Sequence, residues 1–357
     1  MAAVSKLLIP LILMSTQQSV AQVVIPPFLH DLSYPVSAIG FLISIGPVFA
    51  LAARLPSGMV YSGGRARLLM ASALAIVAVC NFLYGFAIQP FQFGFVHALN
   101  GFALGAATTL HLAFFVEVLP ADQDRHHAMG YYAGSLAIGY STGAFASGYI
   151  ADRLGYVATF QVAALLTLAA VVLLAFIRPQ TTKATREAPP ARSSRPRELL
   201  RHLLHPQMAT VIIVALFLNL LHQMGSAFLP LYGLAVGLSL TQIGAIKGVY
   251  ALCNAITRPL SGLIMRHLNS RSLTLFPLPL QSVVMMAVPA FHSFTPILVA
   301  FVVIGFMRAV AIVSNTISMV ESAEEARIGR GMASGVFHAA GDLGNILGPS
   351  AGGLIAA

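Results

Sequence analysis

The chain has 357 residues, of which 57% are hydrophobic and 9% carry a formal charge. A soluble globular domain usually carries about 25% charged residues, so this composition excludes an ordinary cytosolic enzyme and indicates a protein that lies in a lipid bilayer. The two cysteines, Cys80 and Cys253, lie in apolar runs, which excludes a disulfide framework and a cysteine-based metal site.

Eleven apolar segments, bounded by polar residues, glycine and proline, are long enough to be membrane-spanning helices. They lie at about 5–28, 35–61, 67–88, 91–118, 127–151, 156–178, 207–232, 240–265, 272–290, 295–321 and 331–357. The predicted organisation is a six-helix N-terminal half over 1–178, a polar cytoplasmic linker over 179–206, and a C-terminal half with five helices over 207–357.

The positions of the basic residues explain why the net charge is +9. If the N-terminus is cytoplasmic, nearly all of the 20 basic residues fall on the cytoplasmic side, as the positive-inside rule requires. The charge therefore sets orientation, and no nucleic-acid partner is expected because the basic linker lacks interleaved aromatic residues. The first segment also resembles a secretory signal, but we expect an uncleaved span because the second half contains its counterpart.

An internal repeat relates the two halves. Shifting the sequence by 204 residues aligns Pro26 with Pro230, Arg54 to Gly58 with Arg258 to Gly262, and Glu117 with Glu321; a shift of 205 then aligns Gly139, Gly143 and Gly148 with Gly344, Gly348 and Gly353. Two homologous halves in the same orientation are the parallel repeat of one large transporter class. Ala357 aligns with Asp152, so we expect the second half to lack its last helix and the sequence to be C-terminally incomplete.

Four motifs resemble those of the major facilitator superfamily (MFS). They are the loop Gly58 to Arg67, with Ser62 at the acidic position; His97-Ala98-Leu99-Asn100-Gly101, similar to an Arg-x-x-Gln-Gly pattern; the glycines from Gly139 to Gly148; and Gly348-Pro349-Ser350-Ala351-Gly352-Gly353. The resemblance to a general member of this superfamily implies an all-α membrane protein with the MFS fold, built of two six-helix parallel repeats with the twelfth helix missing.

The resemblance also implies roles for particular residues. A gating motif at the cytoplasmic loops would comprise Arg54, Gly58, Arg65, Arg67, Arg258 and Gly262. Close helix packing would involve Gly139, Gly143, Gly348 and Pro349.

Ionisable residues inside a membrane-spanning helix are costly unless they are paired or face a cavity, so they are the first candidates for a functional site. Asp342 is a carboxylate deep in the last segment, and Arg308 lies at a similar depth in the segment before it. They are predicted to pair, either as a structural contact or as the site of proton exchange. His97, and His338 on the helix face of Asp342, complete the predicted proton-coupling group.

Neutral polar residues inside the predicted spans are candidates for a substrate cavity. They are Gln18, Asn100, Asn219, His222, Gln223, Asn315 and Asn345. Contacts between helices are the alternative role for these stripes. Lys247 lies about a third of the way into its segment. It is either a functional residue or a lysine whose side chain extends to the membrane surface.

The sequence contains no enzymatic motif and predicts neither a cofactor nor a metal site. The function expected is secondary active transport of a small solute by alternating access, with proton coupling and export of amphipathic, drug-like solutes favoured. Uptake of a sugar or organic anion, and a membrane protein that does not transport, are the alternatives. The expected partners are the solute, protons and lipid, and the expected state is a monomer in the bacterial inner membrane with a cytoplasmic N-terminus.

Overall fold

The computed structural model describes residues 2–61, 63–118, 125–176, 206–264, 276–325 and 330–356. Within these ranges the secondary structure is helical and contains no strand. Seven of the described helical segments are long and apolar enough to cross a membrane. The prediction of an all-α membrane protein is therefore confirmed.

The helices follow the predicted segments in chain order. They are α1 (Ala2–Asp31), α2 (Val36–Val60), α3 (Gly63–Tyr84), α4 (Pro90–Val118), α5 (Arg125–Ala175), α7 (Pro206–Ala235), α8 (Leu240–Ile264), α10 (Pro277–Ala287) with the short 3₁₀ turn η1 (Val288–Ala290), α11 (Phe294–Glu325) and α12 (Arg330–Ile355). The predicted linker over 179–206 lies almost wholly outside the described residues.

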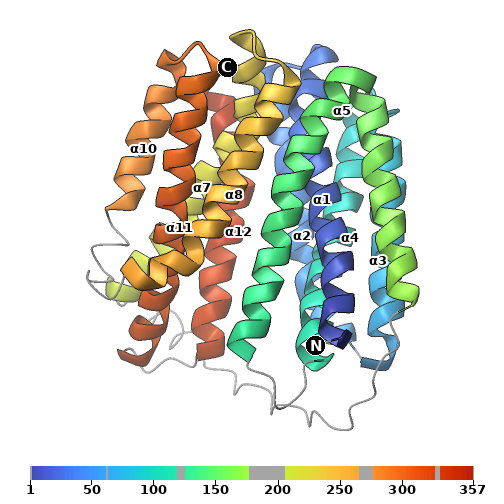
Figure 1. Ribbon diagram of the computed structural model, residues 1–357, viewed down its shortest axis with the longest axis vertical. Helices are drawn as coiled ribbons and strands as arrows, with labels where there is room; N and C mark the ends of the chain where they lie inside the picture. The colour runs from blue at the N-terminus through green and yellow to red at the C-terminus, as the bar shows by residue number, and fades with distance from the viewer. Residues whose placement is uncertain are drawn as a thin grey trace. The chain divides into compact units, whose positions relative to one another are not determined.

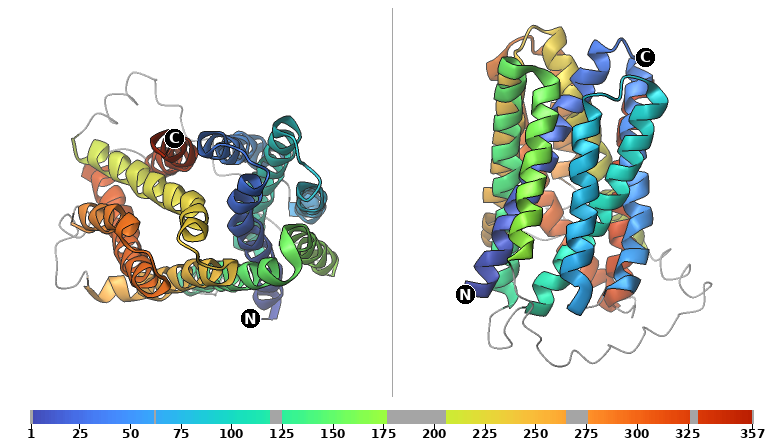
Figure 2. Two further views of the ribbon diagram at one scale, coloured as in Figure 1. Left: turned by 90° about the horizontal axis from the view of Figure 1, so that it is seen from above. Right: turned by 90° about the vertical axis from the view of Figure 1, so that its right-hand side faces the viewer.

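Helix α5 contains two of the predicted spans. It continues from Arg125 to Ala175, but Gly155 has φ +80° and ψ 175°, a backbone conformation that a side chain disfavours. The chain turns back at this glycine, and α5 forms two arms (Figure 1, green) that stand side by side in the second view as well (Figure 2, right). A glycine turn thus replaces the loop expected between 151 and 156.

The chain divides into two compact units. The first comprises residues 1–183, 226–252 and 350–357, and the second comprises 184–225 and 253–349. In the first unit α1 packs against α5, α2 against α4, and α3 against both α4 and α5. Its apolar core includes Leu74, Phe114 and Phe115, which are almost fully buried.

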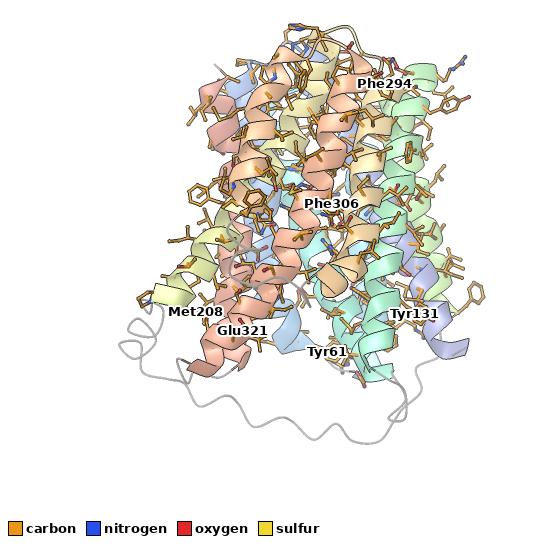
Figure 3. The ribbon with its side chains drawn as sticks, turned by 60° about the vertical axis from the view of Figure 1, so that its left-hand side comes forward. Tyr61, Tyr131, Met208, Phe294, Phe306 and Glu321 are labelled. Carbon is orange, nitrogen blue, oxygen red and sulfur yellow. The ribbon has the colours of Figure 1, made fainter. Side chains whose placement is uncertain are left out.

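In the second unit α10 packs against α11. Figure 3 labels Phe294, Phe306 and Glu321 along α11, and Met208 of α7 lies at the same end as Glu321. Met208 and Val211 are buried there against Met319 of α11. An apolar cluster therefore joins α7 and α11 at this end of the second unit.

Small residues let α5 approach its neighbours closely within the first unit. A side-chain carbon at Gly139 would collide with Ser15 of α1, and one at Gly143 would collide with the carbonyl oxygen of Thr16. On the same helix, Gly148 lies against the backbone of Leu240 in α8. The helices of this unit are in backbone contact at these positions, which fixes the side chains around them.

Candidate functional site

Arg308 lies at the centre of a polar group in the second unit. Its guanidinium is buried, donates from Nη1 to the carbonyl oxygen of Leu218, and donates from Nη2 to Asn219 Oδ1 at 3.0 Å. Asn219 in turn donates to the carbonyl oxygen of Ala215 at 2.9 Å. The two nitrogens of the planar guanidinium thus donate to two different groups of α7, and these hydrogen bonds hold α11 against α7.

Helix α12 reaches the same group through Asn219. A side-chain carbon at Gly341 would lie 2.9 Å from Asn219 Nδ2, and the next residue, Asp342, is half-buried. Asn219 therefore joins the helix that carries Arg308 to the helix that carries Asp342. An ion pair between Arg308 and Asp342 stays a prediction.

The remaining candidates on these helices divide by exposure. Asn315 is fully buried and donates from Nδ2 to the carbonyl oxygen of Val211 at 3.1 Å, which is a contact between helices. His222 and Asn345 are half-buried, whereas His338 is exposed beside the ring of Phe337.

Gln223 of α7 and Gly348 of α12 lie where these two helices meet. Gln223 is half-buried, and its Cβ lies 3.1 Å from where a side-chain carbon at Gly348 would stand. Pro349 lies inside α12 directly after Gly348. This close approach suits the packing role that the motif implies, while substrate contact by Gln223 stays a prediction.

His97 in the first unit has a partner at each ring nitrogen. Nδ1 lies 2.7 Å from the Tyr84 hydroxyl, Nε2 lies 3.2 Å from the carbonyl oxygen of Ile43, and the ring stacks on Phe93. A carbonyl oxygen only accepts, so Nε2 carries the proton and Nδ1 of the neutral ring accepts from Tyr84. A protonated ring could instead donate from Nδ1 to the Tyr84 oxygen, so both ring nitrogens have a hydrogen-bond partner in either protonation state.

A buried amide network crosses the first unit. Asn81 of α3 donates to Gln17 Oε1 at 2.7 Å and to Thr167 Oγ1 at 3.2 Å, and Asn100 donates to Asn81 Oδ1 at 3.5 Å. These bonds join α1, α3, α4 and the second arm of α5. The sequence analysis had singled out Asn100 but missed Asn81 and Thr167, because a polar residue in an apolar run does not reveal its partner.

Gln18 is held by α5. The Tyr140 hydroxyl donates to Gln18 Oε1 at 2.8 Å, and the neighbouring Ser141 donates to the carbonyl oxygen of Gly248 in α8 at 3.0 Å. Tyr140 and Ser141 thereby connect α1, α5 and the middle of α8. The sequence analysis did not predict either residue as part of the site.

Lys247 precedes Gly248 on α8. Its side chain is half-buried, and Nζ donates to the carbonyl oxygen of Ser226 on α7 at 3.0 Å. Like Arg308, Lys247 lies inside a predicted span and donates to a main-chain carbonyl oxygen of α7.

Asp152 caps helix α8, a contact that the sequence analysis missed. Its Oδ1 accepts from the backbone N–H of Leu240 at 3.0 Å, and Oδ2 accepts from that of Thr241 at 2.6 Å. The first N–H groups of a helix have no partner within it and carry partial positive charge, so a carboxylate is a favourable partner. The position of Asp152 just before the turn at Gly155 was a signal that it lies at a helix end.

The predicted gating motif lies mainly at exposed helix ends. Arg54, Arg65 and Arg258 are exposed, and no heavy atom approaches a side-chain carbon built at Gly58. Arg67 is half-buried and donates to the carbonyl oxygen of Ala175 at 3.3 Å, at the end of α5. Gly262 lies in α8, and its surroundings are outside the described residues.

Tyr61 adds a contact at this end that the motif does not contain. Its hydroxyl donates to the carboxylate of Glu117 and so links α2 to α4. Burial and the Glu117 carboxylate raise the pKa of Tyr61 well above its ordinary value of 10.0. A raised pKa in the folded state means that this pair stabilises the fold fully below pH 10 and loses its effect as the pH rises through the folded-state pKa.

Metal binding has no support in the described ranges, which contain no group of three or more histidine, cysteine, aspartate or glutamate residues that could hold an ion. Ionisable groups inside a membrane protein can also bind a charged solute or exchange a proton without a metal ion.

Comparisons with known proteins agree with this architecture. The profile of the family described as Major Facilitator Superfamily matches residues 7–349. The crystal structure of the nucleoside transporter NupG has a TM-score of 0.80 at 16% identity, and covers 99% of this chain and 91% of that one. A bacterial homologue of the human lysosomal transporter Spinster, inward-facing and unoccupied, has a TM-score of 0.78 at 14% identity over 98% of this chain and 81% of its own. No curated protein sequence matches the chain.

Proposed function

Because the chain belongs to the Major Facilitator Superfamily, we propose that it is a secondary active transporter that moves a small solute across a membrane by alternating access. The family profile covers nearly the whole chain, and transporters of known structure share its fold. The observation that carries the proposal is the polar group around Asn219, where Arg308 of α11 and the Asp342 region of α12 meet α7. The proposed moving parts are the two halves 1–178 and 207–357, joined by the linker 179–206.

The proposed driving force is a proton gradient, with Asp342 as the group that takes up and releases the proton. Asp342 is half-buried in α12, and a carboxylate inside a membrane-spanning helix is a group that can bind and release a proton. Loss of the negative charge would change the electrostatic field at Arg308. His97 and His338 are the second choices for the proton site, because both ring nitrogens of His97 already have hydrogen-bond partners within the protein and His338 is exposed.

Export of amphipathic, drug-like solutes is the first proposed direction, on the resemblance to the superfamily and the apolar character of the spans that would line the cavity. Uptake of a sugar or an organic anion is the second candidate. Two basic residues inside the helices, Arg308 and Lys247, favour an anionic substrate. The proposed substrate contacts are the half-buried residues Gln18, Asn100, Asn219, His222, Gln223 and Asn345.

The membrane arrangement proposed with this function has eleven spans. Each of the two arms of α5 would be one span. The other long apolar helices would be one span each, and so would α8, α12 and the short α10, which are not among them. The distribution of basic residues supports a cytoplasmic N-terminus. We propose a monomer in a bacterial inner membrane.

The test is solute flux in proteoliposomes that contain the purified chain. A pH-sensitive dye trapped inside reports proton movement while labelled solutes are followed, with a panel that includes a nucleoside, a sugar, an organic acid and a cationic dye. We expect flux of at least one solute to acidify or alkalinise the lumen and to follow an imposed pH gradient.

Two variants sharpen this test. Asp342→Asn should leave flux down a solute gradient but abolish its dependence on pH, whereas Asp31→Asn makes the same charge change at the end of α1 and should keep that dependence. Flux that ignores the pH gradient in the unmodified chain would refute proton coupling. Absence of flux for the whole panel would favour a membrane protein that does not transport.

A further inference from the structure

Lys247 is a basic side chain whose hydrogen-bond partner is a neutral main-chain carbonyl oxygen. It lies seven residues after the start of α8, about 10 Å along the helix at 1.5 Å per residue. Nζ donates to the carbonyl oxygen of Ser226 at 3.0 Å, and within the described ranges no carboxylate lies at ion-pair distance from it. A cation at such a depth is costly unless it pairs with an opposite charge.

The position of the lysine depends on a proline in the facing helix. Pro230 lies inside α7, and a proline has no N–H to donate to the carbonyl four residues earlier. That carbonyl belongs to Ser226, so its oxygen has no helical partner and is available to Nζ of Lys247. A backbone carbonyl can orient the ammonium group, but it leaves the charge uncompensated and two donor hydrogens free for a ligand.

The neighbouring side chains combine hydroxyl groups and aromatic rings. Ser141 donates to the carbonyl oxygen of Gly248, the residue after Lys247, and the ring of Phe145 lies 2.6 Å from where a side-chain carbon at Gly248 would stand. The hydroxyl of Tyr140, next to Ser141, donates a hydrogen bond to Gln18. Most small-molecule sites have this composition of apolar walls with a few polar groups.

We propose that Lys247 is the residue that recognises the negatively charged group of an organic anion transported by this protein. The carbonyl oxygen of Ser226 would orient the ammonium group, and the anion would neutralise its charge. The aromatic side chains of α5 would contact the apolar part of the anion. This inference rests on the proposed transport function and specifies its substrate class.

The test compares ligands that differ in charge but not in shape. The pairs are benzoate with benzamide, gluconate with sorbitol, and uridine monophosphate with uridine, each added to the purified full chain. Binding is read as a shift in the apparent melting temperature with a thiol-reactive fluorophore, because buried Cys80 becomes reactive on unfolding. We expect at least one anion to bind at least tenfold more tightly than its neutral partner.

Three variants identify the residue responsible. Lys247→Met should abolish the preference for the anion, and Lys247→Arg should keep it within threefold. Arg153→Met removes the same charge from an exposed position beside Tyr149 and should behave as the unmodified chain. Without ligand, Lys247→Met should melt about 2–4 °C higher, since an uncompensated buried charge is removed.

Two outcomes overturn the proposal. One is that no anion binds better than its neutral partner, and the other is that Lys247→Met retains the preference. A merely structural lysine would make the methionine variant less stable. Proton-coupled flux of a neutral solute would sustain the proposed transport function while refuting the role of Lys247, so the two failures can be told apart.

Discussion

The two repeat-related halves of the chain differ in where they place charge. A shift of 204 residues, or 205 beyond the insertion, relates each interior charge of the second half to an apolar residue of the first: Arg308 to Leu104, Lys247 to Ile43 and Asp342 to Ala137. The first half is instead joined by the neutral network around Asn81. The repeat thus preserves helix packing, whereas Arg308, Lys247 and Asp342 have no charged counterpart in the first half.

The same contrast exists at the two contacts that the repeat relates within the first unit. Gly148 lies against the backbone of Leu240, and Gly353 lies against that of Val36, with a distance of 3.1 Å from its built side-chain carbon to the Val36 oxygen. Asp152 adds a carboxylate to the first of these contacts. Close packing is therefore common to both contacts, whereas the carboxylate is present at only the first of them.

The largest expected effect comes from Arg308→Met. Each hydrogen bond from a charged group contributes about 1.5–3 kcal/mol, and Arg308 makes two such bonds to α7, so unfolding should become easier by about 3 kcal/mol or more. Solute flux should fall by at least about tenfold, because the bonds that position Asn219 are lost. Flux and melting temperature in the same preparation measure both effects.

Leu104→Met is the matched control for Arg308→Met at the repeat-related position of the first half. It exchanges one apolar side chain for another of similar volume and should change stability by less than about 1.5 kcal/mol. Equal loss of flux in the two variants would show that the halves contribute alike at this level, contrary to the comparison.

Asn81→Ala should give the second largest effect. It leaves Gln17 without its partner at Oε1, and Gln17 Nε2 already has no partner among the described residues. A buried polar group that loses its hydrogen bond costs about 1–3 kcal/mol, so we expect about 2–3 kcal/mol of lost stability. Flux per folded molecule should stay unchanged if the network is structural.

Asn254→Ala provides the comparison in the second half. Asn254 makes a single bond of 3.4 Å to the carbonyl oxygen of Gly305, so its loss should destabilise by about 1 kcal/mol or less. If Asn81→Ala lost flux while keeping its melting temperature, the network would be part of the transport pathway.

Gly148→Ala and Gly353→Ala compare the two related contacts directly. A methyl group at Gly148 would collide with the carbonyl oxygen of Leu240, whereas one at Gly353 would be tight but tolerable. Overpacking of this kind costs about 1–3 kcal/mol, so Gly148→Ala should lower the melting temperature and Gly353→Ala should lower it less. The reverse order would contradict the packing described for α5 and α8.

The sequence predicted the helices well and the contacts poorly, for a physical reason. Lipid imposes long apolar runs, and the repeat shows which runs correspond, so the positions of α1 to α12 follow from periodicity and length. The connections between helices were less predictable. Two of the predicted spans are connected by a single glycine with positive φ, Gly155, and not by a loop.

Side-chain partners depend on rotation and close approach of helices, which periodicity does not determine. Arg308 and Asn315 were singled out because charge and amides are rare in apolar runs, and both proved to contact α7. Asp152 and Tyr61 were not predicted as site residues, because their roles arise from helix ends brought together by folding.

The smallest effect is expected for Asp152→Asn, at the contact where the halves differ in charge. Ser239 and Gln242 already cap α8, with the Gln242 N–H donating to Ser239 Oγ at 3.2 Å and the Ser239 N–H to Gln242 Oε1 at 3.0 Å. Asp152 accepts from the N–H groups of Leu240 and Thr241 and from the side chains of Thr241 and Ser239, and asparagine retains one oxygen for them. We expect a loss of about 1 kcal/mol, read as a lower melting temperature.

The dependence on salt distinguishes a charge effect from a packing effect at Asp152. Interaction of a carboxylate with a helix terminus is screened by salt, and Asp152 is exposed, so the difference between the unmodified chain and Asp152→Asn should shrink as salt is raised. Arg153→Met, at the next position, should show no such difference. A loss that persists at high salt would mean that hydrogen-bond geometry, and not the charge absent from the related contact at Gly353, stabilises α5 against α8.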